Sequence, residues 1–328
     1  MKRRDFLWLI GGTAAWSQAR AQQTAPMRRV GLLMNASADD PESQEHITAF
    51  RDTLHKLGWS EGRNVQIDIR WGGMRAERTR YYASELAALG PDVIVAAGGP
   101  VAAAVRQASA TVPIVFSQAI DPDGAGQVAS LARPGGNATG FMQFEYGLAG
   151  KWPELLKELA PALKRIGIVR DHPPNPADIG QWAVIQAMGA SLGLEFTPIN
   201  IRDAGEVERG IAEFARGGRG GLIIPVSSVA NFHRQRLVEQ AALHKLPAIY
   251  PNRSFVADGG LIGYGPDLKT QYRLAAGYVH RILKGESLAS LPVQAPAKYD
   301  LVINMKTAKA LKLSVPPALL VRADEVIE

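Results

Sequence analysis

A group of residues follows short apolar runs, at positions where strands of a parallel sheet are expected to end. Ligands of open α/β sheets bind beyond these carboxyl ends, so the residues there are candidates for ligand contact. Their small polar, acidic and aromatic side chains suit a small organic ligand with a polar head. The candidates are Asn35, Ser37, Gly99, Pro100, Val101, Ser117, Asp121, Asp171, Ser227, Tyr250 and Tyr264.

The Gly-Gly-Pro-Val segment at residues 98–101 can provide an anion site at the start of a helix. Backbone N–H groups of Gly99 and Val101 would be unpaired there, and the helix dipole favours a carboxylate beside them. Pro100 in the first turn would preorganise the helix start, since its missing N–H costs nothing at that position. The alternative is that the segment forms only a tight turn between a strand and a helix.

The remaining candidates each have a ligand role and a structural alternative. Asp171 can pair with an amino group, or it can cap the helix that follows Pro176. Ser227 can bond a ligand, or it can cap the helix after it. Tyr250 and Tyr264 can stack on a planar ligand, or they can pack as partly buried side chains.

The sequence lacks the patterns of common enzymes. It contains no cysteine, which excludes disulfides, thiolate metal sites and a cysteine nucleophile. No histidine pair has the i, i+4 spacing of a helical zinc site, and no nucleophile elbow, Walker loop or dinucleotide fingerprint is present. We therefore expect no catalytic residues, no metal and no cofactor, in a protein that is not an enzyme.

Two series of short apolar runs predict the strands that position the candidate residues. Runs of this kind, rich in β-branched residues, are typical of parallel sheets buried on both faces. The first series is Val30–Met34, Val65–Ile69, Val93–Ala96 and Pro113–Phe116; the second is Ile166–Val169, Glu195–Ile201, Leu222–Ile224 and Pro247–Tyr250.

The segments between the apolar runs have the periodicity of helices. Ile47, Phe50, Leu54 and Leu57 share one helix face, and Gly58 follows as a stop signal. Alternation of strands and helices predicts an α/β fold with right-handed crossovers. The length of 328 residues suits two domains, so we expect two doubly wound parallel-sheet lobes.

The N-terminus has the pattern of a secretory signal peptide. A basic segment, Lys2 to Arg4, precedes a short apolar stretch from Phe6 to Trp16. Small residues at Ala19 and Ala21 predict cleavage near Ala21, which would make residues 1–21 the signal peptide. The arginine pair also resembles a twin-arginine signal, but Lys2 replaces the usual Ser or Thr, so the export route stays open.

The positive charge of the chain lies partly in this segment. The full sequence has 37 basic and 31 acidic residues, a net charge of +6. Residues 1–21 contain four of the basic residues and one acidic residue, so the remainder carries 33 against 30, or +3. No dense run of Lys or Arg remains after cleavage, and we expect no nucleic-acid partner.

Several segments resemble a family of periplasmic ABC-transporter substrate-binding proteins, related to tryptophan-binding TrpX-type proteins. The C-terminal residues 298–328, KYDLVINMKTAKALKLSVPPALLVRADEVIE, carry the resemblance most specifically. It extends over nearly the whole chain. Further matching segments are FRDTLHKLGWSEGRNVQIDIRW, PDVIVAAGGP, PIVFSQAIDPDGAGQVASLARPGGNATGF and GGLIGYGPD.

The resemblance implies the fold of type I periplasmic binding proteins, in which three crossover segments join two α/β lobes. The crossings would fall near residues 141–146, 264–267 and 292–298. Lobe 1 would then comprise 28–142 plus 265–294, and lobe 2 would comprise 143–264 plus 295–328.

The implied function is that of a periplasmic receptor, a monomer that closes its lobes around a small organic solute and delivers it to an ABC permease. An amino-acid-like or aromatic carboxylate is the expected ligand class. Relatives often have a hydroxyl residue where Gly99 stands and an Asn-Pro turn after the strand that ends at Val169, so the family's aromatic amino acid does not transfer directly. Two alternatives remain, an exported α/β enzyme and a ligand-sensing module of a membrane receptor.

Overall fold

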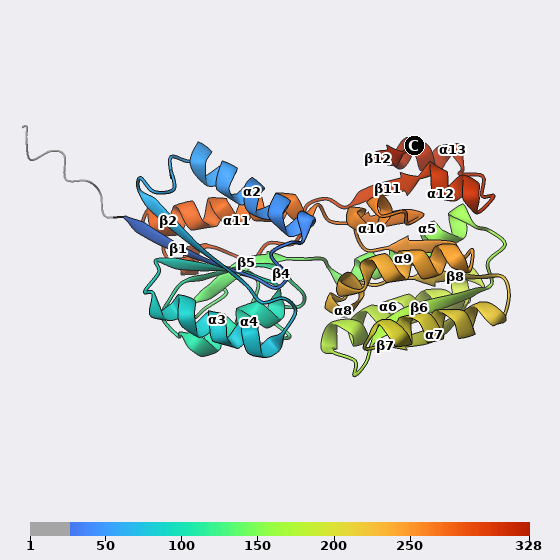
Figure 1. The fold of residues 1–328 in the computed structure, drawn as a ribbon, viewed down its shortest axis with the longest axis horizontal. Coiled ribbons are helices and arrows are strands. Elements are labelled where there is room, and N and C mark those ends of the chain that lie inside the picture. Colours follow the sequence, from blue (N-terminus) through green and yellow to red (C-terminus); the bar gives the residue numbers. More distant parts are fainter. Residues whose placement is uncertain (1–26) are drawn as a thin grey trace, which may run out of the picture.

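The computed structural model describes residues 27–328, which form two α/β lobes (Figure 1). The predicted signal peptide lies outside the described residues. Within residues 27–328 no helix is long and apolar enough to cross a membrane.

Lobe 1 is built on a five-stranded parallel sheet in the order β2-β1-β3-β4-β5. Helices α2 and α11 pack together on one face of this sheet, and α3 and α4 cover the other (Figure 1). The strands are β1 (Arg28–Met34), β2 (Val65–Trp71), β3 (Val93–Ala97), β4 (Ile114–Ala119) and β5 (Ala138–Met142). The helices are α2 (Pro41–Lys56), α3 (Ala76–Ala88), α4 (Gly99–Ala108), α11 (Leu268–Leu283) and the short η2 (Leu288–Ser290).

Lobe 2 contains a seven-stranded sheet in the order β12-β11-β10-β9-β8-β6-β7. Its strands are β6 (Arg165–Asp171), β7 (Glu195–Ile201), β8 (Gly220–Ile223), β9 (Ala248–Tyr250), β10 (Ile262–Gly265), β11 (Asp300–Asn304) and β12 (Glu325–Ile327). Its helices are η1 (Tyr146–Gly150), α5 (Lys151–Leu159), α6 (Pro176–Leu192), α7 (Ala204–Arg216), α8 (Ser228–Phe232), α9 (Arg234–Leu243), α10 (Arg253–Ala257), α12 (Met305–Ala310) and α13 (Pro317–Arg322). One pair of strands, β10 and β11, is antiparallel.

The predicted α/β fold with two sheets is confirmed, and the central strands of each sheet are buried on both faces. Strand β3 has every residue buried, as expected for a central parallel strand. The chain passes between the lobes after β5, between β10 and α11, and after η2. Helix α11 therefore belongs to lobe 1 by packing, since Tyr272, Ala275 and Val279 join the core formed with Phe50 of α2.

Two strands at the lobe boundaries escaped the sequence analysis because glycines interrupt their apolar pattern. In β5, Gly140 adopts a φ of 151°, and a Cβ there would lie 2.0 Å from the carbonyl oxygen of Phe116. In β10, a Cβ on Gly265 would lie 1.7 Å from the carbonyl oxygen of Pro251. The close approach of neighbouring backbones thus requires glycine at both positions. Because glycine has no side chain, it interrupts the apolar pattern by which a strand is predicted from the sequence.

Candidate functional site

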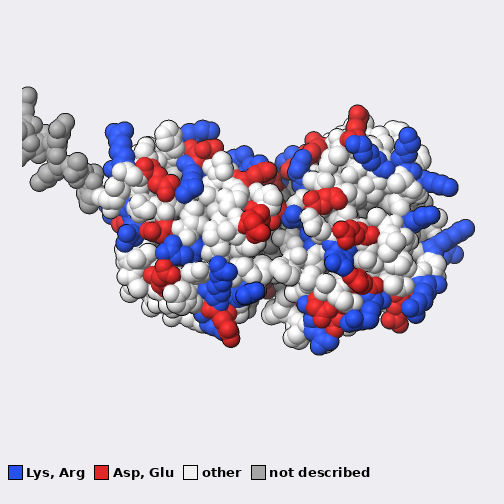
Figure 2. All heavy atoms as spheres, viewed as in Figure 1, with Lys and Arg blue, Asp and Glu red and all other residues white. Residues whose placement is uncertain are grey.

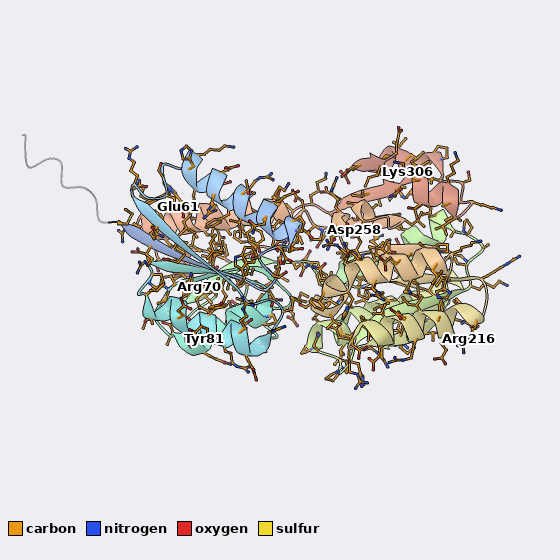
Figure 3. The ribbon with its side chains drawn as sticks, in the orientation of Figure 1. Glu61, Arg70, Tyr81, Arg216, Asp258 and Lys306 are labelled. Carbon is orange, nitrogen blue, oxygen red and sulfur yellow. The ribbon has the colours of Figure 1, made fainter. Side chains whose placement is uncertain are left out.

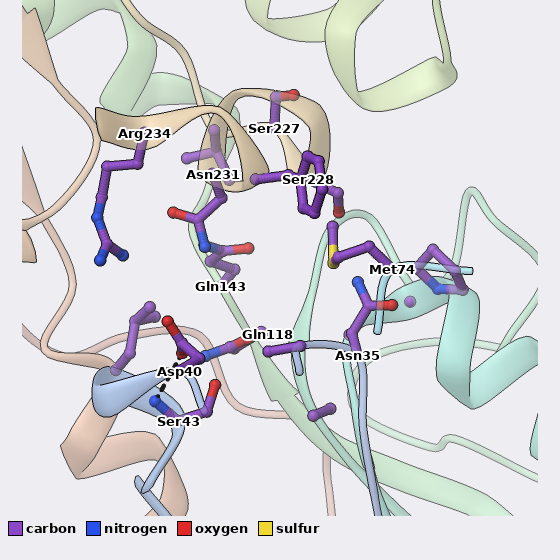
Figure 4. Close-up of a pocket in the computed structure, with 18 of the residues that line it drawn as sticks. Asn35, Asp40, Ser43, Met74, Gln118, Gln143, Ser227, Ser228, Asn231 and Arg234 are labelled. Atoms are coloured by element: carbon purple, nitrogen blue, oxygen red, sulfur yellow. Dashed lines mark hydrogen bonds between the residues drawn. The ribbon is translucent and has the colours of Figure 1, made fainter. Parts of the chain in front are cut away.

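A cavity of about 860 Å³ lies between the lobes and is lined by residues of both. In Figure 2 the surface narrows between the lobes, and acidic and basic side chains are interspersed over both. Figure 4 shows how the segments converge: Asn35, Asp40 and Gln118 approach from lobe 1, while Asn231 and Arg234 face them from lobe 2. We call this space the central cavity. Its size is that of a typical small-molecule site.

Many of the sequence-predicted candidates line the central cavity. Those from lobe 1 follow β1, β3 and β4, and those from lobe 2 follow β6 and β8, as the strand-end rule predicts. They are Asn35, Ser37, Gly99, Pro100, Asp121, Asp171 and Ser227. The lobes therefore bring together residues up to 192 positions apart in the chain, the distance from Asn35 to Ser227.

Four other candidates lie outside the central cavity. Tyr250 is 1% exposed and stacks on Phe255, with ring centroids 5.2 Å apart. Tyr264 packs in the lobe 2 core, and the side chains of Val101 and Ser117 are fully buried in lobe 1. The side chains of Tyr250, Tyr264 and Ser117 thus do not line the central cavity, whereas Val101, in the first turn of α4, is expected to contribute its backbone N–H, and that role stays a prediction. Successive strand residues point to opposite faces, so position at a strand end does not decide which side chain reaches the cleft.

Asp171, the last residue of β6, is the most deeply buried of the carboxylates that line the central cavity. It accepts hydrogen bonds from the hydroxyl of Ser227 and, at 2.9 Å, from the side-chain amide of Asn175. Burial raises its pKa above the usual range. Within residues 27–328 no basic side chain pairs with it, so the carboxylate is available to a cationic group of a ligand.

The sequence offers Asp171 and Ser227 as helix caps, and the structure confirms only the cap by Ser227. Asn175, not Asp171, caps α6, because its side chain accepts from the backbone N–H of Asp178. Ser227 does cap α8 and also donates to Asp171. The cap predicted for Ser227 is therefore confirmed, and its bond to a ligand stays a prediction.

Asp121 brings a second carboxylate into the central cavity, from the loop after β4. Its backbone is left-handed, with a φ of 48°, and its side chain accepts from the N–H of Gly124 at 3.2 Å. The hydroxyl of Tyr146 in lobe 2 donates to it across the lobe boundary at 3.3 Å. Burial, together with this carboxylate, raises the pKa of Tyr146 to about 12, so the phenol stays a donor at neutral pH.

The predicted helix start is present, since α4 begins at Gly99 with Pro100 in its first turn. Gly98 before it has a φ of 101°, a conformation that favours glycine. The side-chain amide of Gln127 donates to the carbonyl oxygen of Gly99 at 3.1 Å, and its own oxygen has no partner within the described residues. The first turn of α4 thus faces the central cavity with no carboxylate cap.

Sequence reasoning missed an ion-pair cluster that joins the lobes at the edge of the central cavity. Glu42 in the first turn of α2 accepts from Arg234 of lobe 2 at 3.1 Å and from the hydroxyl of Ser254 at 2.7 Å. Arg234 also binds Asp258 at 2.6 Å, and Figure 3 shows Asp258 on the side of lobe 2 that faces lobe 1. We call Glu42, Arg234, Ser254 and Asp258 the interlobe latch.

Among the described residues, no lysine or arginine that lines the central cavity lacks an ion-pair partner. The arginines that line it are Arg234 and Arg236, and Arg236 is paired with Glu208. His46 also lines the cavity, where burial lowers its pKa to about 4, so its imidazole is neutral at neutral pH. By contrast Asp121 and Asp171 have no basic partner within residues 27–328, and the cavity favours the positive end of a ligand.

The described residues contain no cluster of three or more histidine or acidic residues arranged to hold a metal ion. The groups that line the central cavity can recognise a ligand: the carboxylates suit an ammonium group, the helix-start N–H groups suit an oxygen, and the side-chain amides can bond other polar atoms. Side-chain amides among the lining residues include those of Asn35, Gln118, Gln143, Asn175 and Asn231.

Known proteins resemble this chain over nearly its full length. A tyrosine-binding protein of Clostridioides difficile (strain R20291) is 25% identical over 96% of this chain and 90% of its own. A crystal structure of a conserved domain protein from Vibrio cholerae is 26% identical, with a TM-score of 0.82 over 92% of this chain and 99% of that one. A Streptococcus ABC domain in complex with L-Trp, 23% identical, has the same fold, with a TM-score of 0.83 over 92% and 100%.

The model of the family described as ABC transporter substrate binding protein matches residues 35–327. That range includes every strand except β1, the three crossings and every residue that lines the central cavity except Met34. The chain belongs to the family of ABC transporter substrate-binding proteins.

Proposed function

We propose that this protein is the periplasmic receptor of an ABC importer and binds a small solute with an amino group between its lobes. The observation that supports this most directly is the central cavity, where Asp121 of lobe 1 and Asp171 of lobe 2 both lack basic partners within residues 27–328. A cationic amine would satisfy both carboxylates only when the lobes are together. Ligand binding and lobe closure would therefore be coupled.

The head of the solute is amino-acid-like in this proposal. An ammonium group lies against Asp171, and a carboxylate or carbonyl oxygen accepts from backbone N–H groups at the start of α4. The curated relative is named for tyrosine binding, and the Streptococcus structure holds L-Trp, which supports a ligand with an amino-acid head.

The lobes close because the solute makes more contacts in the closed form than in the open form. The solute first meets lobe 1 near Gly99, and closure then adds Asp171 and Ser227 of lobe 2. A ligand shifts the lobe equilibrium only by the contacts that it makes solely in the closed form. The permease in the inner membrane would recognise this closed form. Export by the predicted signal peptide, with cleavage near Ala21, would deliver a monomeric receptor to the periplasm.

The affinity for an amine ligand is expected to fall at acidic pH. A proton and the ligand's ammonium group compete for Asp171, whose pKa is raised by burial. Affinity is therefore constant above that raised pKa and decreases as the pH falls through it, at a pH higher than the ordinary aspartate value of about 3.9. Calorimetric titrations over a pH series measure this, and an affinity independent of pH down to about 4 would contradict a role for Asp171.

Identification of the bound solute tests the proposal. The protein is purified from the native periplasm with no ligand added and is then denatured. The small molecules that it releases are identified by mass spectrometry. A single amine-bearing compound in near-stoichiometric amount, which then binds to the refolded protein in calorimetry, is the expected result. A protein that releases no compound and binds none of a broad panel of amino acids and amines would overturn the proposed function.

A further inference from the structure

A second cavity of about 630 Å³ opens beside the central cavity, and we call it the annex. The two share part of their walls, so the annex adjoins the central cavity. The shared residues are Asn35, Gly73, Met74, Pro100, Ala103, Ser228, Phe232 and His233. A ligand whose head occupies the central cavity can therefore extend into the annex without leaving the space between the lobes.

The walls of the annex are mainly apolar. Met74 and Pro100 contribute from lobe 1, and Val229 and Phe232 contribute from α8 of lobe 2. Phe232 is 64% exposed, and its ring makes an edge contact with that of His233, with centroids 4.9 Å apart. An apolar group of a ligand between Phe232 and Met74 would remove this surface from water.

The part of the annex wall that is not shared with the central cavity carries positive charge. Arg75 and Arg80 line it, both are exposed, and neither makes an ion pair within residues 27–328. Helix α3 also begins there, at Ala76, and no side chain caps its N-terminus. Two free guanidinium groups beside an uncapped helix start favour an anionic group.

The other charges of the annex are already neutralised or engaged. Arg202 is paired with Glu206, and the carboxylate of Asp203 accepts from the N–H of Glu206 at the start of α7. Both lie on lobe 2, whereas Arg75 and Arg80 lie on lobe 1. Among the described residues, the cleft therefore has carboxylates without basic partners in the central cavity and arginines without acidic partners in the part of the annex wall that the central cavity does not share.

From this charge pattern we propose that the natural ligand is an extended zwitterion of about dipeptide size. Its ammonium group lies near Asp121 and Asp171, its apolar body lies between Met74, Pro100 and Phe232, and its terminal carboxylate lies at Arg75 and Arg80. A short apolar peptide is the simplest compound with this order of groups. This inference rests on the proposed receptor function and specifies the class of solute.

The test compares three probes that differ in one feature each: the dipeptide Ala-Phe, its C-terminal amide, and L-phenylalanine. Calorimetry on the wild-type protein is expected to give the tightest binding for Ala-Phe and roughly five- to thirtyfold weaker binding for the amide, which lacks the charge that Arg75 and Arg80 attract. L-Phenylalanine, which cannot reach both ends of the cleft, is expected to bind more weakly than the dipeptide.

Substitutions in the annex test where the carboxylate and the apolar body of the peptide bind. In the double variant R75A/R80A, Ala-Phe and its amide should bind equally, because the charge that distinguishes them has no partner. Phe232→Ala should weaken both peptides by about tenfold, since both bury their apolar body there. The matched control is Arg78→Ala, on the same helix but outside the annex, where Arg78 lies over the ring of Tyr82.

Several results would overturn the inference. If the dipeptide and its amide bound the wild-type protein equally, the ligand's carboxylate would have no role in binding. If R78A and R75A/R80A lost the same affinity for the dipeptide, the carboxylate would not lie at Arg75 and Arg80. If the peptides do not bind while the compound released from the purified protein binds wild type and F232A alike, the annex has no role and the receptor function stands. If nothing binds, the proposed function fails with it.

Discussion

Asp171→Asn is expected to weaken the binding of an amine ligand by roughly 10- to 150-fold, the equivalent of about 1.5–3 kcal/mol for a lost hydrogen bond to a charged group. The asparagine has the same shape, so its oxygen can still accept from Ser227. It has no charge, and one of its polar atoms becomes a donor facing the side-chain amide of Asn175. Calorimetry with the compound released from the wild-type protein measures the effect.

The same variant should fold as well as the wild type at neutral pH. Burial raises the pKa of Asp171, so its contribution to folding is full below the unfolded value and is lost as the pH rises through the folded one. Removing the charge therefore offsets the lost bond to Asn175, and we expect the free energy of unfolding at pH 7 to change by less than ~1 kcal/mol.

The control is Asp123→Asn, which removes an exposed carboxylate that does not line the central cavity. It should leave affinity and stability unchanged. If D171N bound the ligand as tightly as wild type, or if D123N weakened binding equally, Asp171 would have no direct contact with the amine.

Glu42→Gln is expected to open the ligand-free protein. Glu42 joins the lobes through Arg234 and Ser254, and the glutamine keeps the size of the side chain but removes its charge. Charge-assisted hydrogen bonds in a partly buried site contribute about 1–2 kcal/mol more than neutral ones, so the ratio of closed to open molecules should fall by roughly 5- to 30-fold. Small-angle X-ray scattering should then give a larger radius of gyration, and the ligand should dissociate faster.

A neighbouring residue provides a matched control for the latch. Glu45 lies on the same helix and pairs with Lys269 of α11, so its ion pair stays within lobe 1. Glu45→Gln should change neither the radius of gyration nor the dissociation rate. If E42Q behaved like E45Q, the interlobe latch would not control the separation of the lobes.

The α/β fold could be predicted from the sequence because the central strands of both lobes are short runs of buried β-branched residues. Val93–Ala97, which is fully buried, is one example. The strands near the lobe boundaries could not be found in this way. Gly140 and Gly265 allow close backbone approach to Phe116 and Pro251, and a strand interrupted by glycine has no apolar alternation to recognise.

The candidate site could be predicted only in part. The strand-end rule locates the edge of a sheet, which was enough for Asp171 and Asn35, but it does not say which way a side chain points, and Tyr250 points into the lobe 2 core. The latch depends on lobe docking, since Glu42 and Arg234 are 192 residues apart in the chain. No local pattern contains that information.

The central claim is that the solute lies between the two lobes and contacts both. Hydrogen exchange measured by mass spectrometry, with and without the compound released from the purified protein, tests it most directly. With the compound bound, we expect slower exchange in both lobes together, in segments that line the central cavity. These segments are residues 35–46 and 97–103 of lobe 1 and residues 171–178 and 226–236 of lobe 2. Protection confined to one lobe, or protection of neither, would contradict the account.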